Sequence, residues 1–390
     1  QEQDPFQRAL PQVGYTEIPA VPGRSLFLTI DKEIQYFTEQ TLAAAAKQYH
    51  AESGTAIVMR VRTGEILAMA NVPDFDPNNF SDFSEDAWKN RAVTDQFEPG
   101  SVFKMITAAA ALEENLATPE TVYSVPDAIQ VSDRVINDSH PHPTEDMTFT
   151  EVIAQSSNVG TIKIGLELGK VLLDKWVRRF GFGKETGLDF PGEGLGQVLE
   201  LDSWYGSTIS QIPIGQGVAV TPIQLVTAYA TLGNGGMWVE PKLVHATLDA
   251  DGGLVPAATP ARRRVLSQDV ANQVLEILTE VVENGTGLEA AVPGYRIAGK
   301  TGTAQKPEAG GYGNSYIASF AGVAPSDHPN IAVLVSLDDP SPIWGGSTAA
   351  PTFQKIVAFT LRQLGVAPTN NAERDLQELQ EGPEEPVVHD

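Results

Sequence analysis

One short stretch, residues 98–113, constrains this chain more than any other part of the sequence. Its second half is rich in alanine and contains neither glycine nor proline, which predicts a regular helix. Pro99 and Gly100 cannot continue that helix backwards, so they predict a turn directly before it. Ser101 then lies at the helix N-terminus and Lys104 one turn further on, on the same face. The lysine amine and the serine hydroxyl are therefore expected to meet.

A serine followed three residues later by a lysine has a plain structural interpretation, an N-cap residue and a surface cation. It also has a chemical one, because a serine nucleophile needs a nearby base. A lysine amine can act as that base when burial or a second cation keeps it neutral. Two later motifs favour the chemical interpretation: the triplet Ser156, Ser157 and Asn158, and the run Lys-Thr-Gly-Thr at residues 300–303.

Together these residues supply what acyl transfer requires, namely a nucleophile, a proton path and groups that hold the substrate. We expect Ser101 to be the nucleophile and Lys104 to be its general base. The hydroxyl of Ser156 can relay a proton to the leaving group. Asn158 has a donor and an acceptor with which to orient Lys104 and a substrate amide, although asparagine is also common in turns.

The third motif predicts an edge strand that faces the N-terminus of the nucleophile helix. We expect Lys300 to provide a fixed positive charge for a substrate carboxylate, and this charge would also keep Lys104 neutral. Gly302 has no Cβ, so a substrate backbone could approach it closely. Thr301 and Thr303 offer hydroxyls to the same carboxylate.

The three motifs, S-x-x-K, S-x-N and K-T-G in this order, resemble those of the transpeptidase domain of penicillin-binding proteins. The resemblance covers roughly residues 24–366. Further segments resemble the class B branch of that family, namely 64–70, 215–217 with 221–222, and 298–305. Residues 98–101 and 349–353 favour the division (septal) branch over the elongation branch.

The resemblance implies an α+β fold of the penicillin-binding-protein and serine β-lactamase type. An antiparallel sheet would be covered by helices on both faces, with a helical subdomain between the motifs. It also implies a serine-type D,D-transpeptidase that attacks the D-Ala-D-Ala end of a peptidoglycan stem peptide through Ser101 and passes the acyl group to an amine. The backbone N–H groups of Ser101 and Thr303 would form the oxyanion hole. β-Lactams would acylate the same serine, and neither a metal nor an organic cofactor is implied.

The same resemblance implies a location and partners. Class B proteins work at the extracytoplasmic face of the bacterial membrane, anchored by an N-terminal helix that this chain does not contain. Their partners are a membrane glycosyltransferase and, in the division branch, divisome proteins, which we expect to be reached through the missing N-terminal regions. The upstream sequence would show whether an anchor and a pedestal domain precede this chain.

Composition sets outer limits on these interpretations. The 390 residues contain no cysteine, which excludes disulfides and thiolate catalysis, and no apolar run of about 18 residues that could span a membrane. A net charge of −24 argues against nucleic acid as a partner, because phosphate binding needs a basic surface. Residues 1–23 predict a linker or the remnant of an upstream domain, 24–366 the catalytic domain, and 367–390 an acidic, disordered tail.

The rest of the chain predicts alternating helices and strands. We expect an antiparallel hairpin at 55–61 and 65–70, and an irregular segment from 117 to 146. Within that segment His140 and His142 flank a proline, but no third ligand accompanies them, so we expect no metal site there. The other strands are expected at 26–30, 295–303, 316–323 and 331–337, and helices after Asp31 and at 150–156, 159–168, 172–180, 222–231, 268–283 and 351–363.

Several other functions share the same motifs. A class A β-lactamase would need a glutamate that activates the deacylating water, typically in a Glu-x-x-Leu-Asn segment, and none follows Asn158. Ser157 also stands where the β-lactamase pattern has aspartate. A D,D-carboxypeptidase or a β-lactam-sensing domain would use the same acylation site. Intact motifs argue against a catalytically silent scaffold.

Overall fold

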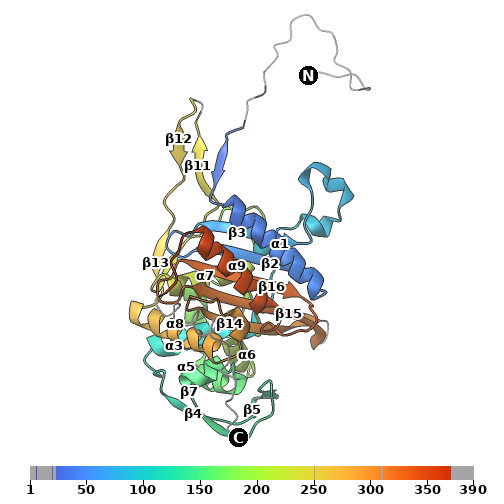
Figure 1. Ribbon diagram of the computed structural model, residues 1–390. Coiled ribbons are helices and arrows are strands. Elements are labelled where there is room, and N and C mark those ends of the chain that lie inside the picture. Colours follow the sequence, from blue (N-terminus) through green and yellow to red (C-terminus); the bar gives the residue numbers. More distant parts are fainter. Residues whose placement is uncertain (1–5, 7–19, 21–22, 250, 309–310, 370–390) are drawn as a thin grey trace, which may run out of the picture. The chain divides into compact units, whose positions relative to one another are not determined.

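The computed structural model describes residues 6, 20, 23–249, 251–308 and 311–369 (Figure 1). Its contacts divide the chain into two units, one of residues up to 28 together with 244–258, and the other of 29–243 with the residues from 259 onwards. The sequence placed residues 24–28 and 244–258 inside the catalytic domain, so the unit boundary differs from the predicted one. The predicted linker and acidic tail lie mostly outside the described residues.

The smaller unit is a three-stranded antiparallel sheet. Its strand order is β1 (Leu26–Leu28), β11 (Val244–Leu248) and β12 (Leu254–Pro256). The strand predicted at 26–30 is therefore present but ends two residues earlier. All three of its side chains are exposed, so it is held by the strand pairing rather than by a core of its own.

A five-stranded antiparallel sheet organises the larger unit (Figure 1). It confirms the predicted hairpin, the predicted strand that contains the last motif and the two predicted strands that follow it. In spatial order its members are β14 (Ala298–Glu308), β15 (Gly311–Ala324), β16 (Ile331–Asp338), β2 (Ser53–Arg60) and β3 (Ile66–Val72). Strand β15 begins five residues before the predicted start, because its polar first part carries no apolar alternation but pairs with the end of β14.

Alternating side chains of the central strands enter two separate cores, one on each face of the sheet. Ala56 and Val58 pack on the face covered by α1 (Lys32–Gln48) and α9 (Ala349–Gln363). These two helices lie side by side in Figure 1. The Asp31 side chain caps α1 as the sequence predicted. The first face is therefore closed by the N-terminal and C-terminal helices of the unit.

Ile57 and Met59 point to the opposite face. This face is covered by α7 (Pro222–Gly233) and α8 (Gln268–Glu283), and α3 (Lys104–Glu113) packs against α8. A capping box at Thr221, followed by proline at the first helical position, starts α7 as predicted. Helices thus cover both faces of an antiparallel sheet, which confirms the predicted α+β fold. The helical subdomain contains α4 (Phe149–Ala154), α5 (Asn158–Phe180) and α6 (Thr208–Gln211).

The segment predicted to be irregular, residues 117–146, instead forms four short strands. They pair as β4 with β7 and β5 with β6, each pair antiparallel. Each strand has four residues and half-exposed side chains, so the apolar alternation that predicts a strand is too short to detect. Their bounds are β4 Val122–Val125, β5 Ala128–Val131, β6 Arg134–Asn137 and β7 Glu145–Thr148.

The two helices predicted at 159–168 and 172–180 are the two arms of α5, which bends at Gly169, where φ is +70°. The other helical elements are α2 (Arg91–Thr94) and six short 3-10 turns: η1 Pro77–Asp82, η2 Glu85–Trp88, η3 Gly100–Phe103, η4 Leu201–Ser203, η5 Ile212–Ile214 and η6 Leu288–Ala290. The remaining strands are β8 (Gln197–Val198), β9 (Val218–Ala219), β10 (Met237–Val239) and β13 (Arg262–Arg264). Within the described ranges, no helix is both long and apolar enough to cross a membrane.

Candidate active site

The expected nucleophile lies in a tight turn that leads into α3. Ser101 belongs to the 3-10 turn η3, and the α-helix itself begins only at Lys104, three residues later than the sequence suggested. Gly100 has φ of +57°, and a Cβ at this position would lie 3.0 Å from the Cβ of Ala304 on strand β14. Glycine is needed there both for the backbone conformation and for the close approach of the strand.

Three segments fix the start of this nucleophile turn. The backbone N–H of Gly100 donates to the carbonyl of Gly215 at 3.0 Å. The Glu98 carboxylate accepts from the N–H of Gly217 at 2.9 Å and from the Tyr312 hydroxyl at 2.9 Å. Burial raises the pKa of Glu98. The sequence analysis did not identify Glu98 as a site residue, because its partners come from distant segments that only the fold brings together.

Lys104 is fully buried, and its amine faces the second motif. Its Nζ donates to the carbonyl of Ser156 at 2.6 Å and to Oδ1 of Asn158 at 2.8 Å, and it lies 3.3 Å from the Ser156 hydroxyl. Desolvation lowers the pKa of Lys104 to about 7, against an opposing attraction from Asp138. The structure therefore brings together the lysine, serine and asparagine that the sequence assigned to one site, and it favours a neutral amine near neutral pH.

The predicted direct contact between the nucleophile and its base is not made. Within the described residues, no hydrogen bond joins the Ser101 hydroxyl to the Lys104 amine, because the amine points to the second motif. Catalytic hydrogen bonds are often long before substrate binds, so this geometry still permits proton transfer. The second motif is the nearer partner of Lys104.

The second motif is a strained turn at the start of α5. Ser156 has φ of +63°, a left-handed conformation that costs a non-glycine residue of the order of 1–3 kcal/mol. Ser157 is the N-cap, and its hydroxyl accepts from the N–H of Gly160 at 2.8 Å. The turn presents both the carbonyl and the hydroxyl of Ser156 to Lys104. The predicted turn between two helices is confirmed.

Asp138 is a further charged group at this turn, and the sequence analysis missed it. One carboxylate oxygen accepts from the backbone N–H groups of Asn158 and Val159, the latter at 3.0 Å. The other oxygen accepts from the Ser157 hydroxyl at 2.7 Å and lies 3.1 Å from Nε2 of His142. Asp138 directly follows β6, in the segment predicted to be irregular, so no periodicity marked it. Within that segment the sequence singled out His142, which lies beside Asp138.

Lys300 is the first residue of the third motif, and its side chain is fully buried. Its Nζ lies 3.4 Å from both the carbonyl and the hydroxyl of Thr301. Burial lowers the pKa of Lys300 well below its usual value, and the positive charge of Lys104 lowers it further. Burial thus works against the expected fixed positive charge, because a buried ammonium group without a contacting carboxylate is disfavoured and the charge of Lys104 repels it. An anionic ligand at Thr301 would favour the charged form again.

Gly302 also has a different role from the expected one. A Cβ built on it would lie 2.5 Å from Oγ of Ser319, 3.0 Å from Cγ1 of Val102 and 3.1 Å from the carbonyl oxygen of Pro99. The missing side chain therefore faces the nucleophile turn rather than a substrate. Glycine at this position lets strand β14 pack closely against the turn that holds Ser101.

A cleft of about 490 Å³ brings the motifs to one surface. Ser101, Ser156, Asn158, Thr301 and Thr303 all line it, whereas Lys104, Lys300 and Gly302 lie in the protein behind the lining. The hydroxyl of Thr303 accepts from the N–H of Gly345 at 3.1 Å, and the Thr301 hydroxyl lies 2.8 Å from that of Thr286. The rim also carries Glu289 and two rings, those of His140 and Trp344, whose centroids are 6.4 Å apart.

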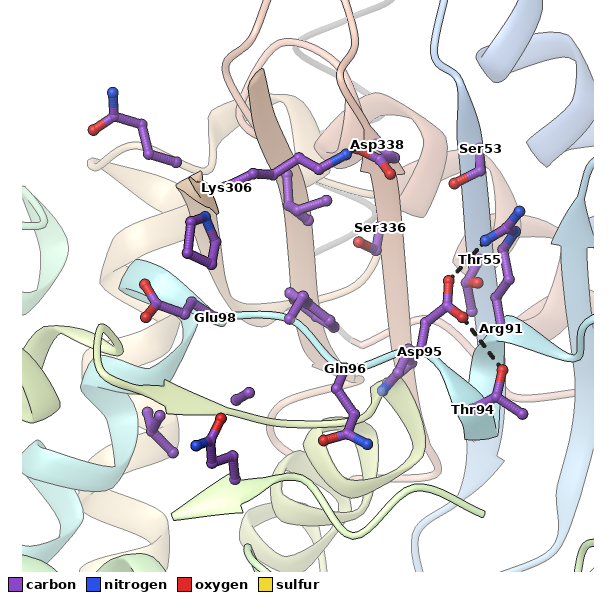
Figure 2. Close-up of a pocket in the computed structure, with 18 of the residues that line it drawn as sticks. Ser53, Thr55, Arg91, Thr94, Asp95, Gln96, Glu98, Lys306, Ser336 and Asp338 are labelled. Atoms are coloured by element: carbon purple, nitrogen blue, oxygen red, sulfur yellow. Dashed lines mark hydrogen bonds and ion pairs between the residues drawn. The ribbon is translucent and has the colours of Figure 1, made fainter. Parts of the chain in front are cut away.

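A larger cavity, of about 760 Å³, lies beyond Glu98 and is drawn in Figure 2. The strands β2 and β16 contribute polar side chains to its lining. Its cations are already paired, Arg91 with Asp95 at 2.8 Å and Lys306 with Asp338 at 2.7 Å. None of the predicted site residues is among the residues that line it. The smaller cleft, where the three motifs meet, is therefore the candidate active site.

The comparisons with known proteins agree with this geometry. The family described as the penicillin binding protein transpeptidase domain matches residues 54–358. The penicillin-binding protein PbpB of Mycolicibacterium smegmatis is 38% identical over 89% of this chain and 56% of its own length. The peptidoglycan D,D-transpeptidase FtsI of Escherichia coli is 34% identical over 94% of this chain and 60% of its own length.

The chain thus spans somewhat more than half the length of these curated relatives. The crystal structure of penicillin-binding protein 3 from Mycobacterium tuberculosis, complexed with aztreonam, superposes with a TM-score of 0.86. It is 36% identical, and the match covers 91% of this chain and 83% of that one. By sequence, fold and motif geometry, the chain belongs to the family of penicillin-binding protein transpeptidase domains.

Proposed function

We propose that this chain is the catalytic domain of a peptidoglycan D,D-transpeptidase that cross-links stem peptides through a Ser101 acyl-enzyme. The observation that carries the proposal is the buried amine of Lys104, which three polar groups of the second motif surround at the floor of the cleft that Ser101 lines. A lysine with its pKa lowered to about 7 is matched to general-base work at neutral pH.

In the first half-reaction the Ser101 oxygen attacks the carbonyl carbon of the penultimate D-alanine. The hydroxyl proton passes to Lys104 and on through the Ser156 hydroxyl, 3.3 Å away, to the nitrogen of the departing D-alanine. The peptide C–N bond breaks as the ester bond to Ser101 remains. The backbone N–H groups of Ser101 and Thr303 are the proposed oxyanion hole, which stabilises the charge that develops on the carbonyl oxygen.

The substrate carboxylate would bind beside the third motif. Thr301 and Thr303 line the cleft and offer two hydroxyls, while Lys300 lies behind them with its amine 3.4 Å from the Thr301 hydroxyl. A carboxylate at this position favours a protonated Lys300, since an opposite charge raises a lysine pKa. Lys300 would therefore contribute through Thr301 and through its charge once the ligand is bound.

In the second half-reaction an amine of a neighbouring stem peptide attacks the ester carbonyl. The new amide C–N bond forms, the bond to the Ser101 oxygen breaks, and the proton from the amine returns to that oxygen by way of Lys104. A β-lactam enters the same site because it presents an acyl group and a carboxylate in the arrangement of D-Ala-D-Ala.

The cellular role is also part of the proposal. We place the enzyme at the extracytoplasmic face of the bacterial membrane, in septal cell-wall synthesis. A membrane glycosyltransferase and divisome proteins would be its partners. The support is family membership, together with the segments at 98–101 and 349–353 that resemble the division branch.

Product analysis tests the proposed reaction. The chain is incubated with a stem pentapeptide ending in D-Ala-D-Ala and with an acceptor amine of stem-peptide type. We expect a cross-linked dimer that forms in step with released D-alanine, and neither product from Ser101→Ala. Release of D-alanine with free tetrapeptide and no dimer would favour a D,D-carboxypeptidase. Acylation by penicillin without either product would favour a β-lactam-sensing domain.

A further inference from the structure

We propose that Asp138 is a positioning residue for the reaction: with His142 it forms an acid–imidazole pair that locks the Ser156–Asn158 turn against Lys104. The inference rests on the proposed function, because it concerns the geometry of the same proton path. Asp138 does not itself line the active-site cleft. It would act through the groups that do.

The carboxylate of Asp138 has four donors and thus a fully satisfied hydrogen-bonding shell. Two are backbone N–H groups at the N-terminus of α5, those of Asn158 and Val159. The third is the N-cap hydroxyl of Ser157 at 2.7 Å, and the fourth is Nε2 of His142 at 3.1 Å. The side chain is only 7% exposed, so water does not compete for these bonds. A carboxylate at a helix N-terminus is stabilised by the helix dipole and by the unpaired N–H groups there.

These hydrogen bonds stabilise a turn whose backbone conformation is strained. Ser156 adopts φ of +63°, and strain of this kind persists only where the surroundings over-determine the conformation. Asp138 binds the three residues that follow Ser156: the hydroxyl of Ser157 and the backbone N–H groups of Asn158 and Val159. The neighbouring carbonyl of Asn137 accepts from Nδ2 of Asn158 at 3.0 Å, which leaves Oδ1 of that amide to accept from Lys104. The end of strand β6 thus fixes both catalytic side chains of the second motif.

His142 completes the pair with a positive charge. Its Nδ1 lies 2.7 Å from the carbonyl oxygen of Pro143 and its Nε2 lies 3.1 Å from the Asp138 carboxylate. Both ring nitrogens face acceptors, and this arrangement favours the protonated imidazole, in which both nitrogens can donate. These contacts raise the pKa of His142, and Glu145 adds a weaker attraction. The histidine thereby offsets part of the carboxylate charge.

The pair also affects the charge of the base. Asp138 is the charged group that acts on Lys104, because it attracts the protonated amine, whereas the neighbouring buried amine of Lys300 has its own pKa lowered by Lys104. Removing the Asp138 charge should therefore lower the pKa of Lys104 further. Removing the His142 charge should do the opposite, because Asp138 then acts uncompensated. Replacing a residue that only stabilises the fold would not change the pKa of Lys104 in either direction.

The test measures the rate at which a fluorescent penicillin acylates Ser101, as a function of pH. For Asp138→Asn we expect acylation at the optimum to slow by at least about tenfold. We also expect the acid limb of the profile to move to lower pH, because Lys104 stays neutral further into acid. Asp174→Asn is the matched control. Asp174 lies on α5, the helix whose N-terminus Asp138 binds, but it pairs with Arg178 at 3.0 Å far from the turn. Its rate and profile should match wild type.

Two further variants separate the effect of holding the turn in position from the effect of charge on Lys104. Ser157→Ala removes one bond to Asp138 but no charge, so it should slow acylation without moving the acid limb. His142→Gln keeps one donor but removes the positive charge, so it should move the acid limb to higher pH. If Asp138→Asn does not fold, as judged by thermal unfolding, these two variants carry the test.

The results distinguish failure of this inference from failure of the proposed function. Wild-type rate and pH profile in a folded Asp138→Asn would overturn the role of Asp138 while leaving Ser101 acylation intact. A slower rate with an unmoved acid limb in Asp138→Asn, or an unmoved limb in His142→Gln, would reduce the pair to a structural support and overturn the electrostatic part. Absence of Ser101-dependent acylation in wild type would instead count against the proposed function itself.

Discussion

At the scale of single residues, the site depends on what surrounds two buried amines. Lys104 is enclosed by hydroxyl, carbonyl and amide oxygens but touches no carboxylate, so desolvation outweighs the distant attraction of Asp138. The Lys300 amine contacts Thr301, and burial lowers its pKa well below the usual value. Burial shifts both amines toward the neutral form, and a substrate carboxylate beside Thr301 would oppose that shift for Lys300.

The pKa of Lys104 predicts the pH dependence of acylation. A base must be neutral to accept the proton of Ser101, and the pKa of Lys104 is lowered to about 7, so the acylation rate should fall as pH drops through about 7. Stopped-flow acylation by a penicillin between pH 5 and 9 measures this directly. A rate that stays constant down to pH 5, with the protein folded throughout, would exclude Lys104 as a base with this pKa.

At the scale of elements, the site exists because strand β14 packs tightly against the nucleophile turn. The contact is glycine on both sides: Gly100 approaches Ala304, and Gly302 approaches Val102 and Pro99. The strand proposed to bind the substrate and the turn of the proposed nucleophile are thereby fixed relative to each other. Any side chain between them separates the proposed oxyanion donors of Ser101 and Thr303.

Gly302→Ala tests this packing. The added Cβ would overlap Ser319 and crowd the backbone of Pro99, and overpacking of this kind costs about 1–3 kcal/mol. We expect acylation to slow at least about tenfold as the turn shifts. Gly54→Ala is the control, because its Cβ would crowd Leu337 of the same sheet and Leu42 of α1 but nothing in the nucleophile turn. Both variants should lose thermal stability; equal acylation rates in the two would argue against the role given to Gly302.

At the scale of the whole molecule, the sequence predicted the fold and most of the site because both leave local signals. Helices such as α8 carry strong periodicity, and the three motifs supply ordered, unusual residue types. The short strands of residues 117–146 left none, so Asp138 was missed with them and His142 was considered only as a metal ligand. Glu98 was missed because its partners, Gly217 and Tyr312, are distant in sequence. Burial lowers the pKa of Lys300, and no sequence pattern predicts the burial of a single amine.

The most direct test of the central claim is intact-mass spectrometry of the chain after exposure to penicillin. Attack by Ser101 opens the lactam ring, so the Ser–acyl bond forms, the ring C–N bond breaks, and the whole mass of the drug stays on the protein. The released amine remains tethered and hinders the next nucleophile, so we expect one persistent adduct on wild type and on the exposed-serine control Ser203→Ala, and none on Ser101→Ala. Rapid return of unmodified protein with steady drug hydrolysis would contradict the transpeptidase account and point to a β-lactamase, with Glu289 at the cleft rim as the carboxylate to examine.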